Sequence, residues 1–122
     1  MDFLVPGQPA QEAAGGSSAL DALSTTLRSW FGQPDFRGCA FLNAAAELGS
    51  SDPEILATVR RHKQEMSSVL DRLFGGRSVS VGAALTLVAD GAIVHAQMGQ
   101  PIDEVMENFK AAAEGIVSRP GL

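Results

Sequence analysis

Three side chains in this sequence, Cys39, His62 and His95, carry groups suited to nucleophilic or metal chemistry. No two of them have the short spacings, such as C-x2-C or H-x3-H, that place ligands on one metal ion. A nucleophilic Cys39 would need a base from elsewhere in the chain, and His62 is the candidate. Because cysteine is commonly a buried residue, we favour a core position for Cys39. We therefore predict no metal site and no catalytic residue, and a small helical enzyme using Cys39 and His62 is the alternative.

His62 lies in the middle of an apolar helical stripe, one turn from Val59 and from Met66. It is either a core histidine with an internal hydrogen-bond partner or the polar point of a mostly apolar small-molecule pocket. The first interpretation is favoured by the residues alone, and the second stays open.

Three further polar residues have two interpretations each. Asn43 and Glu47 are one helical turn apart, so they either contact each other on a solvated face or line the mouth of a pocket. Asp90 lies in an apolar segment and, if buried, must be paired. Its partner would lie across a subunit interface or in the backbone turn at Gly91.

The length, net charge, motif content and cysteine count of the chain exclude several classes of function. A chain of 122 residues is one domain by length, and its net charge of −5 provides no electrostatic surface for nucleic acid. There is no G-x-S-x-G sequence, phosphate-binding loop or dinucleotide fingerprint, so no cofactor is predicted. A single cysteine and the absence of a signal-peptide pattern favour a cytoplasmic protein.

Helical spacing of apolar residues predicts five helices, and no segment alternates in the way that a strand does. The helices are expected at about residues 19–31, 39–48, 53–74, 79–98 and 102–117. Asp52 followed by Pro53 is a strong helix start, since aspartate caps the helix and proline suits its first position. The predicted fold class is therefore all-α.

The fourth expected helix is apolar on two opposite faces. One face carries Val81, Ala84, Leu85, Val88, Ala92 and His95, and the other carries Ala83, Leu87, Val94 and Met98. Only a narrow strip is polar, formed by Thr86, Asp90 and Gln97. Such a helix must be covered on more than one side, and a second subunit is the natural cover in a chain this small. The charge of Asp90 argues against a membrane span.

The fifth expected helix has small residues on the side away from its own core, where another helix can approach closely. We therefore expect a homodimer interface made by Ala83, Leu87, Val94, Met98, Ala111, Ala112 and Gly115.

The sequence FRGCAFLNAAAE at residues 36–47 resembles a segment in the C-terminal effector-binding domain of TetR-family transcriptional regulators. Three weaker features agree with it: Trp30, the pattern Val59-x-x-His62-Lys63 and Asp90-Gly91-Ala92. Together they extend the resemblance over about residues 18–118, with Ala40 replacing the proline common in that family.

The resemblance implies a five-helix bundle, orthogonal and antiparallel, that is not an enzyme. Its last two helices would pair with those of a second copy, and its earlier helices would enclose a small, often apolar effector. That cavity would lie beside Phe41, His62 and Met66. We expect the ligand-binding residues to be Trp30, Phe41, Asn43, His62, Met66, Leu70 and Val88. A pure dimerisation module with a closed core is the alternative.

Regulators of this family carry a basic helix-turn-helix ahead of the effector domain. Residues 1–16 are rich in proline and glycine and are expected to be a flexible lead-in to a domain at 17–122. The resemblance then implies that this chain makes no direct contact with nucleic acid and none with a membrane. Either it is an excised domain of a longer regulator, or it is a natural relative without the DNA-binding head.

Overall fold

The computed structural model describes residues 16–74 and 81–118. Within them lie five helices and no strand, which confirms the all-α class. Their bounds are α1 (Gly16–Phe31), α2 (Ala40–Leu48), α3 (Pro53–Leu73), α4 (Gly82–Gln97) and α5 (Ile102–Ser118). Helix α1 begins at the last residue of the expected lead-in, and residues 79–80 of the expected fourth helix lie outside the described part.

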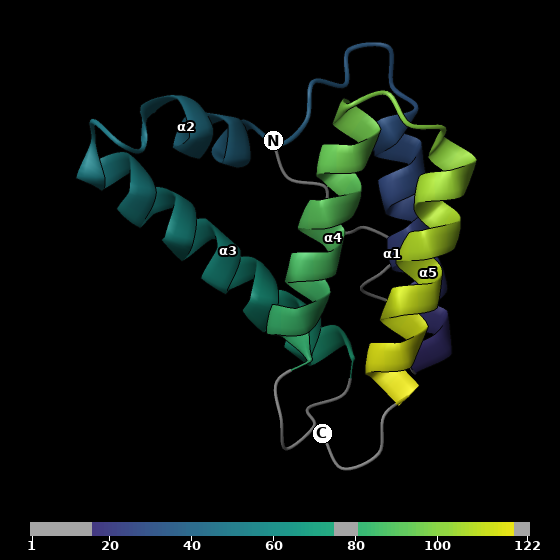
Figure 1. Cartoon of the computed structure of the whole chain (residues 1–122). Helices are drawn as coiled ribbons and strands as arrows, with labels where there is room; N and C mark the ends of the chain where they lie inside the picture. The colour runs from purple at the N-terminus through teal and green to yellow at the C-terminus, as the bar shows by residue number, and fades with distance from the viewer. Residues whose placement is uncertain (1–15, 75–80, 119–122) are drawn as a thin grey trace.

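The helices form a bundle with one inclined arm (Figure 1). Helices α4 and α5 run antiparallel and side by side, and α1 packs against α5 behind them. Helix α3 meets α4 at its C-terminal end and leans away from it toward its N-terminal end, where α2 packs against it. The α2–α3 arm and the α4–α5 pair therefore present separate surfaces.

The core lies where α1, α4, α5 and the end of α3 meet. Helix α1 contributes Leu20, Leu23 and Leu27, which recur at helical spacing and are buried. Each fully buried leucine stabilises the fold by roughly 1.5–3 kcal/mol. The other helices contribute buried apolar side chains that include Leu70, Leu85, Ile93, Val105, Met106 and Phe109.

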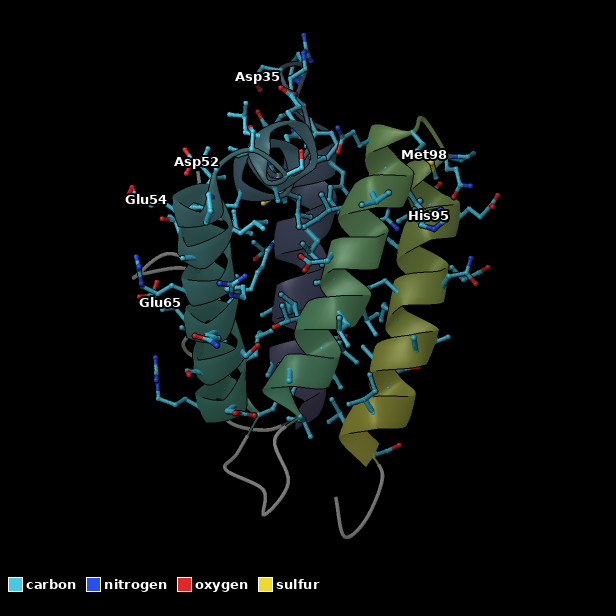
Figure 2. All side chains as sticks on the ribbon, turned by 60° about the vertical axis from the view of Figure 1, so that its left-hand side comes forward. Asp35, Asp52, Glu54, Glu65, His95 and Met98 are labelled. Carbon is cyan, nitrogen blue, oxygen red and sulfur yellow. The ribbon has the colours of Figure 1, made fainter. Side chains whose placement is uncertain are left out.

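The start of α3 is as predicted. The Asp52 carboxylate accepts a hydrogen bond from the Glu54 backbone N–H at 3.0 Å, and Pro53 occupies the first helical position. Acidic side chains then follow the outer side of this helix, where Glu54 and Glu65 point away from α4 (Figure 2). The amphipathic pattern of α3 thus directs its apolar side toward the rest of the bundle.

Helix α4 is capped by a residue of another helix. The Gly82 N–H donates to the Asp71 carboxylate of α3 at 2.7 Å. The two helices cross so closely here that a Cβ on Gly82 would lie 1.9 Å from the Ser67 carbonyl oxygen. Glycine is therefore required at this crossing for close approach rather than for flexibility.

Two predictions about α4 were wrong. Thr86 was placed on a polar strip, but it is buried against α3, where its hydroxyl donates to the Gly82 carbonyl and lies 3.0 Å from Ser67 Oγ. His95 was placed on the core face, but it is exposed and its Nδ1 lies 2.9 Å from Gln100 Oε1. Both errors arise because helical spacing gives the side of a helix on which a residue lies but not which sides are covered by other helices. No helix in the described ranges has the length and apolarity to cross a bilayer.

Candidate functional site

An aromatic stack joins α2 to α3. The Phe41 ring lies on the His62 ring with centroids 3.8 Å apart and planes 6° from parallel. Both side chains are partly exposed. Two of the three residues that the family resemblance placed beside an effector cavity are therefore in direct contact.

An ion pair lies next to this stack and connects three segments of the chain. Lys63 Nζ donates to Asp90 Oδ1 on α4 at 2.8 Å and lies 3.7 Å from the Cys39 sulfur at the start of α2. The Lys63 and Asp90 side chains are only 17% and 22% exposed, so solvent screens this pair weakly. Asp90 is paired as expected, but its partner is Lys63 of α3 rather than a group across a subunit interface or the backbone turn at Gly91.

Asn43 makes a second link from α2 to α4. Its amide donates to the Arg37 carbonyl at 3.0 Å, and its oxygen accepts from Gln97 Nε2 at 3.1 Å. The loop before α2 passes next to the Gln97 side chain, and Gly38 in this loop has a φ of +85°, a backbone conformation that favours glycine. Asn43 therefore holds the helix junction together and does not pair with Glu47.

The seven predicted ligand-binding residues are spread over several parts of the structure, although Trp30, Phe41 and Val88 all pack against the core that contains Leu70. Phe41, His62 and Met66 share the α2–α3 junction, with Met66 buried one turn beyond His62. Leu70 is part of the main core, and Trp30 packs against Phe31 and Phe36 with ring centroids 5.8 and 5.1 Å away.

Val88 lies in a groove between α4 and α5, apart from the α2–α3 junction. The groove has a volume of about 310 Å³ and is lined by Val88, Ala92, His95, Gln100, Val105, Asn108 and Phe109. The structure therefore separates the predicted site into the α2–α3 junction, the core and this groove. Lys63 was not among the residues predicted for the site. Its position directly after His62 in the pattern Val59-x-x-His62-Lys63 was the signal that could have indicated it.

The predicted interface residues all lie on exposed surface. Leu87, Val94 and Met98 are 74%, 43% and 62% exposed, an unusual exposure for large apolar side chains. Ala83 on α4 and the small residues Ala111, Ala112 and Gly115 on α5 are exposed as well. Met98 lies at the turn that joins α4 to α5, close to His95 (Figure 2). These positions follow the outer side of the α4–α5 pair, beside the groove.

Cys39 is 3% exposed. Its side chain makes no capping hydrogen bond to α2, although it occupies the N-cap position. Burial keeps this thiol from substrates in solvent, and so favours the core role expected for it over that of a nucleophile.

The fold matches that of a known transcriptional regulator. The crystal structure of a TetR-family transcriptional regulator from Streptomyces coelicolor superposes with a TM-score of 0.69 and 24% sequence identity over 89% of this chain. The chain has a TetR-family fold. It spans 59% of the length of that regulator. No protein-family model and no curated protein sequence matches the chain.

The match confirms the fold expected from the FRGCAFLNAAAE segment, and four residues of that segment have structural roles. Gly38 makes the turn with positive φ, Cys39 enters the core, Phe41 stacks on His62, and Asn43 joins α2 to α4. In the TetR-family fold of this chain, the segment therefore docks α2 on its neighbours.

Proposed function

We propose that this chain is the ligand-sensing and dimerisation part of a TetR-type transcriptional regulator and that it catalyses no reaction. The observation that carries the proposal is the exposed apolar side of α4, formed by Leu87, Val94 and Met98. At 100° per residue these three side chains lie on one side, and exposed large apolar side chains gathered on one side of a helix are typical of an interface. The small residues Ala111, Ala112 and Gly115 of α5 suit close approach by helices of a second copy.

The effector site that we propose is the α2–α3 junction around Phe41, His62 and Met66. An aromatic ring, an imidazole and a methionine supply apolar contact with one adaptable polar group, the usual composition of a small-molecule site. Lys63 and Asp90 lie beside it as a closed ion pair. We therefore expect a small, mainly apolar effector rather than a charged one.

Dimerisation is tested by the dependence of thermal stability on concentration. If folding and association are linked, the unfolding midpoint of the intact chain rises with protein concentration. A midpoint that stays constant over a hundredfold concentration range contradicts the dimer.

Effector binding is tested by thermal shift against a panel of small apolar and aromatic compounds. A compound that binds only the folded state raises the midpoint. Met66→Ala should reduce that rise, whereas Glu65→Ala, on the outer side of the same helix, should leave it unchanged. If no compound in the panel raises the midpoint, the chain is a pure dimerisation module.

The negative net charge supports assigning no DNA contact to this chain. In a regulator of this type, we propose that DNA is bound by a separate helix-turn-helix.

A further inference from the structure

A second groove lies between α1 and α5. It has a volume of about 490 Å³, within the usual range for small-molecule sites. Its walls are polar, unlike those of the α4–α5 groove, and it is lined by Asp21, Ser24, Thr25, Arg28, Asp103, Met106, Glu107 and Lys110. Neither the proposed effector site nor the proposed dimer interface includes any of these residues.

Ser24 has a buried hydroxyl without a partner in this groove. The residue is 8% exposed, and its Oγ has no hydrogen bond within the described structure. Other hydroxyls in the bundle find acceptors: Thr26 of α1 donates to the Ala22 carbonyl at 2.9 Å, and Thr86 of α4 donates to that of Gly82 at 2.8 Å. A buried polar group left unpaired is unfavourable and calls for a partner from outside the chain.

The charges around the groove favour a cation. Its two basic residues are already paired across the helices, Arg28 with Asp103 and Lys110 with Asp21. The third carboxylate, that of Glu107, forms no ion pair with any residue in the described ranges. A ligand with a positive charge would thus meet one free carboxylate, while an anion would have to break an existing pair.

The groove also has an apolar element between its charged ends. Met106 is the apolar residue of the lining, and because it is only 2% exposed, the methylene part of a ligand would contact just the edge of its side chain. The hydroxyl of Ser24 can accept a hydrogen bond from an ammonium group, and the carboxylate of Glu107 can accept another.

We propose that the α1–α5 groove binds a small aliphatic amine, whose ammonium group donates to Ser24 Oγ and to the Glu107 carboxylate while its methylenes contact the edge of Met106. Most of the groove lies away from the proposed dimer interface. At 100° per residue, the groove residues of α5 lie on the side opposite Ala112 and Gly115, whereas Ala111 lies one turn beyond Glu107 at the edge of the groove.

The test is a titration of the intact, isotope-labelled chain followed by amide NMR shifts, with 1,4-diaminobutane as the probe. Two matched compounds of similar length, uncharged 1,4-butanediol and anionic succinate, serve as controls. We expect saturable shifts near Ser24 and Glu107 with the diamine alone. No saturable shift with the diamine, or the same shifts with all three compounds, overturns the proposal.

Two variants separate specific binding from attraction by charge. Ser24→Ala keeps every charge and should have a thermal midpoint no lower than the natural chain, because it removes an unpaired buried hydroxyl. Ser24→Ala and Glu107→Gln should each weaken diamine binding about tenfold, as expected for the loss of one charge-assisted hydrogen bond. Glu104→Gln, on another side of α5, should leave the affinity unchanged. Loss of affinity in Glu107→Gln with full affinity in Ser24→Ala overturns the site, because charge alone would then explain binding.

Discussion

Lys63 on α3 and Asp90 on α4 form a shielded ion pair, with Nζ and Oδ1 2.8 Å apart and less than a quarter of either side chain exposed. The pair joins the α2–α3 arm to the α4–α5 pair, close to the Phe41–His62 stack. It therefore connects the proposed effector site to the helix that carries the proposed dimer interface.

Removing one member of this pair should destabilise the fold. Lys63→Met leaves the Asp90 carboxylate uncompensated in a poorly solvated place, and we expect a loss of about 2–3 kcal/mol in unfolding free energy. Urea denaturation measures the loss. Lys110→Met is the matched control, because its pair with Asp21 is long at 3.5 Å and largely exposed, and its loss should stay below about 1 kcal/mol. Equal losses in the two variants would contradict a structural role for the Lys63–Asp90 pair.

The α3–α4 crossing should not tolerate a methyl group. In Gly82→Ala the new Cβ meets the Ser67 backbone oxygen, so the helices must separate, at a cost of about 1–3 kcal/mol. Gly32→Ala is the control, since its Cβ would lie no closer than 3.5 Å to the atoms around it. Chemical denaturation of both variants decides the matter, and an unchanged stability of Gly82→Ala would show that the crossing is looser than described.

The thiol of Cys39 should be protected in the folded chain. Because the residue is 3% exposed, we expect its reaction with a thiol reagent such as dithionitrobenzoate to be slow in buffer and rapid in urea. Absorbance of the released thiolate gives both rates. A native rate close to the unfolded one would revive the interpretation of Cys39 as a reactive residue.

The link between Asn43 and Gln97 should stabilise the docking of α2 only modestly. Asn43→Ala removes hydrogen bonds to Arg37 and Gln97 at a partly exposed site, and we expect a loss of about 1 kcal/mol. The control is Asn108→Ala, which removes a bond to the Glu104 carbonyl within its own helix. A double-mutant cycle of Asn43 with Gln97 measures their coupling, and zero coupling would rule out this contact in solution.

Local signals in the sequence were sufficient for the elements of the fold. The Asp52–Pro53 start of α3, the buried stripe of α1 and the uncovered apolar side of α4 each depend on neighbours within two helical turns. The FRGCAFLNAAAE segment supplied the fold itself, through its resemblance to a known family.

Side-chain pairs between helices that are distant in the sequence could not be predicted from such local signals. Lys63 and Asp90 are 27 residues apart, and Asn43 and Gln97 are 54 residues apart. Helical spacing gives the side of a helix on which a residue lies, but not which helix packs there. Trp30, Leu70 and Val88 were accordingly assigned to one cavity, although they face an aromatic cluster, the core and the α4–α5 groove.

The central claim is that the exposed side of α4 is a dimer interface. It is tested most directly by measuring the molar mass of the chain by light scattering as it elutes from a size-exclusion column. We predict a mass of twice the 12.7 kDa of one chain, and a mass of one chain for Leu87→Glu. Leu48→Glu, an equally drastic change at another exposed leucine on α2, should remain a dimer. A natural chain that elutes as a monomer, or a Leu87→Glu variant that stays dimeric, would contradict the account.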